Sequence, residues 1–173
     1  MNAAHLHLAI NHAPVITFAV SLVFLLLALV RRNATLSQVA LSLTVASALL
    51  CLAAYLTGSG AVAVLRDFDH NHPAMSAHAR FGKLTMFAAI ATGLLALIGL
   101  FATDKGVPRK WLVGLITLAV MAVNLMLTAT ATLGGDITHS EIATDQFSGM
   151  IGRLFGLHSL GHQETGHPDG DGD

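Results

Sequence analysis

The sequence has few of the residues on which soluble catalytic domains depend. Only 11% of its 173 residues are charged, against 54% that are hydrophobic, which excludes an ordinary soluble domain and is typical of a small integral membrane protein. A single cysteine rules out a disulfide framework, a CxxCH haem-attachment motif and a paired-cysteine metal site. No nucleophile–base pair, phosphate loop or dinucleotide fingerprint is present, so any chemistry must come from a bound cofactor or a partner.

Two further absences concern partners and processing. No basic stripe is interleaved with aromatic residues, so we expect no nucleic-acid partner. The residues before Ala13 include no Lys or Arg, whereas a signal peptide needs a basic region ahead of its apolar core. We therefore expect the first apolar run to be retained as a helix.

Four apolar runs are each long enough to cross about 30 Å of hydrocarbon at 1.5 Å per residue. They cover about 13–30, 37–57, 81–101 and 111–133, and each is uncharged through its middle. In lipid the backbone must satisfy its own hydrogen bonds, and strand-like alternation is absent. The sequence therefore predicts an all-α, integral membrane four-helix up-down bundle over residues 1–142, with lipid as its surroundings.

Charge differs between the two sides of this bundle. The two short connections carry one acid, Asp104, and five cations: Arg31, Arg32, Lys105, Arg109 and Lys110. The other side has more acidic than basic residues. Because basic residues in short loops stay cytoplasmic, we expect both termini outside, in the periplasm if the chain belongs to a bacterial inner membrane.

The remaining segments lie on the expected outer side. We expect the connection 58–78 to form a folded cap, and Gly134-Gly135 to turn the backbone sharply after the last helix. Residues 143–160 have apolar side chains at helical spacing, which predicts a short amphipathic surface helix. Residues 161–173 are Gly, His, Asp and Pro for the most part, and we expect a disordered tail.

The histidines all fall on this outer side. Three of them, His12, His78 and His139, stand where a predicted helix meets the interface, and in an up-down bundle these three positions share one level. His12 is the first choice in the opening segment because Pro14 fixes the start of the helix there. His5, seven residues before His12, shares its face, and His7 is expected to point elsewhere; both remain supporting candidates.

Two neighbouring features suggest room beside the histidines. Gly82 begins a row of small residues on the third predicted helix, into which either a flat cofactor or another helix could press. Asn124 lies in a polar stripe on the fourth predicted helix, at a depth where an amide needs a partner.

Histidines at one level allow several chemistries. Haem b is held by a pair of axial imidazoles and would suit electron transfer. Three converging imidazoles, from His12, His78 and His139, would instead suit copper or zinc. Proton relay is a third possibility, because histidine titrates near neutrality.

The same positions carry a family resemblance. The segment His5-Leu-His7-Leu-Ala-Ile-Asn-His12-Ala-Pro14, then Leu56-Thr57-Gly58, His78 and Leu133-Gly-Gly-Asp-Ile-Thr-His139-Ser-Glu-Ile142 resemble the four-helix bacterial membrane proteins of the DUF2231-like group. The resemblance covers about residues 5–142. It implies an organisation like that of small two-haem cytochrome bundles, with b-type haem on His12, His78 or His139. This chain has Ala79 where the family pattern has an acid, so no acid-dependent role is implied there.

Together these features lead to one expected function and two alternatives. We expect a haem b-binding membrane subunit that transfers electrons at the outer face of a larger redox complex, with other membrane or periplasmic redox subunits, or a quinone, as partners. The first alternative is a copper or zinc site on the same histidines. The second is a cofactor-free accessory subunit of a membrane complex. An electron-transfer or accessory subunit is favoured over a stand-alone catalyst.

Overall fold

The computed structural model describes residues 3–65, 72–104 and 107–138. His139, the predicted amphipathic helix at 143–160 and the tail at 161–173 lie outside the described residues.

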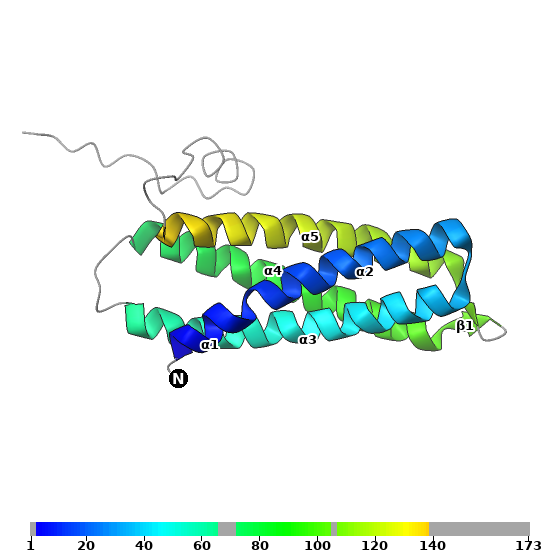
Figure 1. Cartoon of the computed structure of the whole chain (residues 1–173), viewed down its shortest axis with the longest axis horizontal. Coiled ribbons are helices and arrows are strands. Elements are labelled where there is room, and N and C mark those ends of the chain that lie inside the picture. Colours follow the sequence, from blue (N-terminus) through cyan, green and yellow to red (C-terminus); the bar gives the residue numbers. More distant parts are fainter. Residues whose placement is uncertain (1–2, 66–71, 105–106, 139–173) are drawn as a thin grey trace, which may run out of the picture.

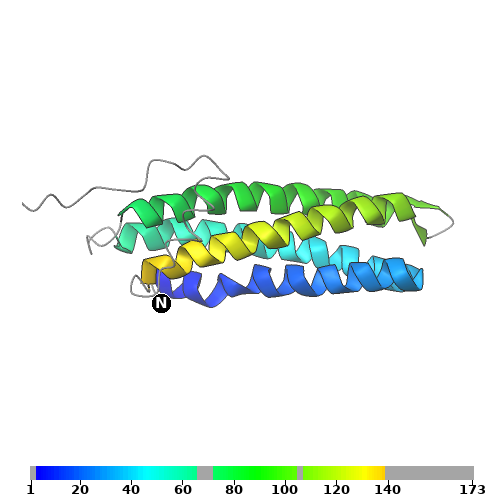
Figure 2. The same cartoon turned by 90° about the horizontal axis from the view of Figure 1, so that it is seen from above.

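The described chain is an all-α bundle of four long helices, as predicted. A short helix α1 (Ala3–Ile10) leads into α2 (His12–Arg31), followed by α3 (Ala34–Leu65), α4 (His72–Phe101) and α5 (Lys110–Thr138). Two short antiparallel strands, β1 (Thr103–Asp104) and β2 (Val107–Pro108), join α4 to α5. The long helices lie side by side (Figures 1 and 2), with α3 between α2 and α4, and α5 packed against α4 and α2.

Four segments are apolar and long enough to cross a membrane: His5–Arg31, which includes most of α1 and all of α2, Ala34–Gly58, Ala77–Phe101 and Lys110–Gly135. They match the four predicted runs. The first segment begins at His5 rather than near residue 13, and the others extend a few residues further at one or both ends. The chain is therefore a candidate multi-pass membrane protein with a lipid bilayer around it.

Two expectations about glycine-containing segments are wrong. Helix α3 continues through Gly58 and Gly60 to Leu65, and α4 already begins at His72, so most of the expected cap consists of helix ends. Helix α5 likewise continues through Gly134 and Gly135. Membrane helices tolerate glycine because it lets neighbouring groups approach closely, and the two histidines described below make use of such approaches.

The first span is broken between α1 and α2. Pro14 has no backbone N–H and its ring would clash with the carbonyl of residue 10, so α1 ends at Ile10 and α2 begins at His12. Pro14 thus lies in the first turn of α2, as predicted. Asn11, at the break, still donates its backbone N–H to the His7 carbonyl at 2.8 Å. The break allows α1 to lie against α3 rather than continue along α2.

The core below this break is held by close helix contacts. The Ser21 and Thr44 hydroxyls are 2.6 Å apart, and the Ser21 hydroxyl also donates to the Ala40 carbonyl, which fixes α2 on α3. Helices α3 and α4 approach so closely that a Cβ on Gly93 would lie 2.5 Å from the Ala48 Cβ. The row of small residues on α4 is therefore filled by a neighbouring helix at this level.

Candidate functional site

Two histidines from different helices lie against neighbouring helices at the end of the bundle where α1 is found. His7 of α1 and His78 of α4 are both half-buried, whereas His5 and His12 are exposed. Both half-buried rings lie at the same end of the bundle, His7 against α3 and His78 against α5. The side chain of His12 lies on the outside.

The order expected for the opening segment is thus reversed, for a geometric reason. Residues five apart on a helix project in very different directions, so His7 and His12 do not share a face. The break at Asn11 then sets α1 on α3 with His7 on the contact face. Sequence periodicity gave the relation between His5 and His12, but it did not show which face meets another helix.

His7 is oriented by the backbone of α3. Its Nδ1 lies 3.0 Å from the Ala54 carbonyl oxygen and 3.3 Å from the Thr57 hydroxyl. The Thr57 hydroxyl donates its own proton to carbonyls of α3, and a carbonyl only accepts, so Nδ1 must carry the imidazole proton. The Nε2 atom of neutral His7 therefore keeps a free lone pair.

His78 is oriented in the same manner by α5. Its Nδ1 lies 3.0 Å from the Thr130 carbonyl oxygen, so it too donates from Nδ1 and keeps the lone pair on Nε2 when neutral. Its ring packs over Gly134, where an added Cβ would lie 3.0 Å from Cε1. The ring of His7 packs over Gly58 in the same fashion, with a corresponding distance of 3.1 Å.

The two sites share one local design. In each, the accepting carbonyl belongs to a residue four positions before the glycine under the ring: Ala54 before Gly58, and Thr130 before Gly134. A helical carbonyl points toward the residue four positions later, so a side chain there would cover it. Because glycine has no side chain, the carbonyl oxygen can accept a second hydrogen bond, and the imidazole Nδ1–H donates it.

Gly82 and its neighbours set the register of α4 against α5. A Cβ on Gly82 would be 3.7 Å from the Thr130 methyl group, an ordinary contact. The Thr85 hydroxyl, which is buried, lies 2.9 Å from the Thr130 hydroxyl. These contacts hold Thr130 where its carbonyl meets His78, so Gly82 lies beside the histidine site as a packing position.

Asn124 has the partner that its depth requires. Its amide nitrogen donates to the Phe18 carbonyl of α2 at 3.2 Å and to the Val120 carbonyl of its own helix at 2.9 Å. Both bonds go to protein, so they join α5 to α2 and account for the amide without a ligand.

The expected three-histidine metal site is not assembled within the described residues. No group of three His, Cys, Asp or Glu side chains there could hold a metal ion. His78 is half-buried and His12 exposed, and His139 lies outside the described residues. Of the three ligands expected for that metal site, His78 is the one shown oriented by a neighbouring helix within the described residues.

The sequence analysis did not assign several residues of the site their observed roles. Gly58 and Gly134 were noted as loop, turn and motif positions, but not as supports for the histidine rings. Ala54 and Thr130 contribute carbonyls that no sequence pattern marks. Asn11 is different, because it follows His7 by four residues and so shares its face. Its side-chain oxygen is buried and has no hydrogen-bond partner within the described chain, which leaves one acceptor available beside the site.

Comparison of the chain with family models, with curated proteins and with solved structures found no match.

Proposed function

We propose that this protein is a membrane subunit that binds haem b through His7 and His78 and carries electrons at this end of the bundle. The observation that supports it is the matched pair of imidazoles, each donating from Nδ1 to a backbone carbonyl and each with a free Nε2. Such a hydrogen bond fixes the tautomer and raises the basicity of the ligating nitrogen. Two neutral imidazoles from different helices are a ligand set suited to the iron of haem b.

The surroundings of the pair fit a flat apolar group. The buried side chains at this end include three alanines, Ala54, Ala61 and Ala77, and the glycines under the rings add no volume. The buried oxygen of Asn11 offers an acceptor for a polar edge of the group. When bound, haem b supplies a one-electron couple; His7 and His78 hold it, and the lipid-embedded helices exclude water.

The orientation and partners follow from charge and position. The histidine end is opposite the two cation-rich connections, so the proposed site faces the periplasmic side of a bacterial inner membrane. Electron exchange at that level suits a periplasmic redox subunit or a quinone in the adjoining leaflet. Membership of the DUF2231-like group belongs to the same proposal, since its characteristic histidine segment contains both His7 and Asn11.

An optical spectrum of the purified protein tests the proposal directly. Fully loaded wild type is expected to show a Soret band and a sharp α-band on reduction. His7→Ala and His78→Ala should each lose most of the bound haem, because one imidazole remains. The exposed histidines provide matched controls: His5→Ala and His12→Ala should keep the wild-type spectrum. Size-exclusion profiles of all four variants separate loss of haem from loss of fold.

Other outcomes identify the alternatives. Absence of a Soret band in loaded material would end the haem assignment, and stoichiometric copper or zinc by elemental analysis would replace it with the second hypothesis. If the His12→Ala and His139→Ala variants lose haem and His7→Ala keeps it, the ligands are those that the sequence favours, and His7 is not one of them. A colourless, metal-free protein whose histidine variants all support assembly of its complex would be an accessory subunit.

A further inference from the structure

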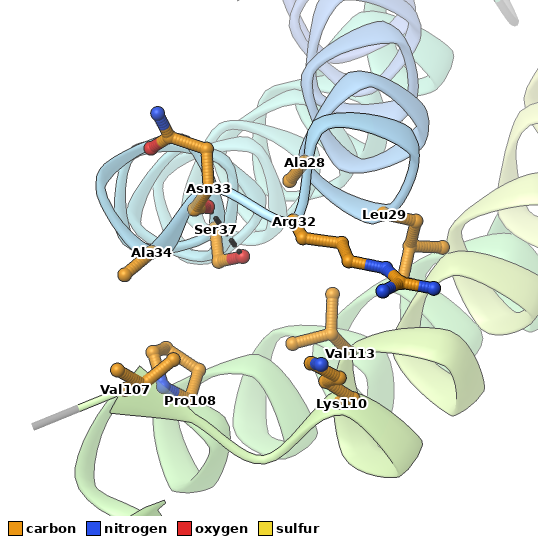
Figure 3. A pocket seen from close by; sticks show the side chains of 10 residues that line it. All are labelled: Ala28, Leu29, Arg32, Asn33, Ala34, Ser37, Val107, Pro108, Lys110 and Val113. Atoms are coloured by element: carbon orange, nitrogen blue, oxygen red, sulfur yellow. Dashed lines mark hydrogen bonds between the residues drawn. The ribbon is translucent and has the colours of Figure 1, made fainter. Parts of the chain in front are cut away.

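The end of the bundle opposite the histidines carries a small pocket that the proposed function does not use. It is formed where α2 turns into α3 and where β2 leads into α5 (Figure 3). Its lining residues are Ala28, Leu29, Arg32, Asn33, Ala34, Ser37, Val107, Pro108, Lys110 and Val113. Its volume is about 70 Å³, well below the roughly 300–1,000 Å³ of pockets that hold organic ligands, so it suits a compact polar group rather than an organic cofactor.

Two cations from separate connections line this pocket. Figure 3 shows Arg32 on the α2–α3 turn, its guanidinium extending on the side of Leu29, and Lys110 at the start of α5, with Val113 between them. Both are exposed, and within the described ranges neither forms an ion pair. Asp104, the acid on this side, is exposed and is not among the lining residues. Among the described residues, the positive charge at the pocket is therefore uncompensated.

The backbone around Arg32 explains why its side chain is available. Arg32 has φ 50° and ψ 41°, and it is the single non-glycine residue with positive φ among the described residues. This left-handed residue ends α2, with its N–H donating to the Ala28 carbonyl. Asn33 then caps α3 by accepting the Leu36 N–H at 3.0 Å. The guanidinium of Arg32 is not used in either cap.

The pocket lies at the level where hydrocarbon gives way to lipid headgroups. One candidate span ends at Arg31, the next begins at Ala34, and the fourth begins at Lys110. Exposed apolar side chains adjoin the cations, among them Leu29 in the pocket wall and Trp111 beside Lys110. A ligand that presents a phosphate to two cations and an acyl chain to an apolar helix surface matches this arrangement.

We propose that the Arg32–Lys110 pocket binds the headgroup phosphate of an anionic phospholipid in the leaflet on this side. Charge complementarity defines the ligand class, and the two helix faces beside the pocket accommodate its chains. This site is independent of the histidine pair. Its position matches the cation-rich side expected to face the cytoplasm, where anionic lipids attract basic residues.

Lipid titration of the purified full-length protein, followed by native mass spectrometry, tests the site. The probes are phosphatidylglycerol, phosphatidylcholine with the same acyl chains, and inorganic phosphate. Wild type should prefer phosphatidylglycerol. The Arg32→Gln/Lys110→Gln double variant should lose on the order of tenfold in affinity for it. The matched control is Arg31→Gln/Arg109→Gln, which removes the same charge from two exposed residues outside the pocket and should change affinity by less than about threefold.

One further variant would support the lipid site, and two other results would overturn it. The charge-retaining variant Arg32→Lys/Lys110→Arg should bind as wild type does, which shows that loss in the first variant comes from charge rather than misfolding. Equal losses in the pocket and control variants would overturn the proposal, because binding would then follow overall charge. Displacement of the lipid by inorganic phosphate at similar concentration would also overturn it, in favour of a free-phosphate site.

Discussion

The two ends of the bundle differ in their buried side chains and in their polar contacts. At the end of the α2–α3 turn, several large aliphatic side chains are buried, with alanines such as Ala28 and Ala40 between them: Leu25, Leu41, Leu112, Val113 and Ile116. At the histidine end, four alanines are buried beside Pro14, Phe81 and Leu133: Ala54, Ala61, Ala77 and Ala129. Two histidines at that end are bonded to backbone carbonyls of other helices. The first end therefore buries more large aliphatic side chains, and the second has the two histidines to which we propose that a ligand binds.

The largest expected effect comes from the packed end. Ile116 is fully buried and its Cδ1 is close to Gly99, so Ile116→Ala should lower the free energy of unfolding by about 2–5 kcal/mol. The haem spectrum of the folded fraction should be unchanged. Leu115→Ala, at a lipid-facing position that is 46% exposed, is the control and should cost about 1 kcal/mol or less. Chemical unfolding in detergent measures both, and equal costs would show that the packing contrast is unimportant.

The next effect tests the close approach of α3 and α4. Gly93→Ala would put a Cβ 2.5 Å from the Ala48 Cβ, so the helices must separate, at a cost of about 1–3 kcal/mol. The double variant Gly93→Ala/Ala48→Gly should recover most of that loss, because the methyl group has then only changed sides. Failure of the second substitution to rescue the first in the same unfolding measurement would place the strain elsewhere.

A smaller effect on stability, but a specific one on the site, is expected at the ring-supporting glycines. Gly134→Ala would place a Cβ 3.0 Å from Cε1 of His78, so the ring must shift by a few tenths of an ångström. The gain of about 1 kcal/mol expected for glycine to alanine in a helix should be reduced or lost. The reduction potential and α-band of the proposed haem should change.

The neighbouring glycine is the control for that prediction. A Cβ on Gly135 meets nothing within 4 Å, so Gly135→Ala should leave the spectrum and potential as in wild type. Spectroelectrochemistry of the two variants separates an effect on His78 from a general effect on α5. Identical changes in both would argue against ring support by Gly134.

The smallest effect concerns Asn124. Asn124→Leu removes the hydrogen bond to the Phe18 carbonyl, which should lower the free energy of unfolding by roughly 0.5–1 kcal/mol. Haem content should stay constant, since the amide bonds protein groups only. A loss of haem in this variant, measured from the Soret absorbance per mole of protein, would return Asn124 to the list of cofactor-binding residues.

The contrast between the ends also explains what the sequence could predict. Hydrophobic length and the absence of charge determine the four spans, because they depend on each segment alone. Which histidine faces inward depends on how α1 packs once Pro14 ends it at Ile10, and periodicity does not give that relation. Gly58 and Gly134 suggested non-helical segments, because glycine has a low helix propensity and this property can be read from the sequence. The imidazoles that use the open backbone lie some fifty positions away in the chain, and no local pattern connects them.

The shared orientation of the two imidazoles has a consequence for proton movement. A backbone carbonyl oxygen accepts a hydrogen bond from Nδ1–H of His7 or His78. The carbonyl is far too weak a base to remove that proton. A group bound at Nε2 would therefore gain and lose electrons without releasing a proton through either ring. A proton that accompanied those electrons would have to move through groups other than these two imidazoles.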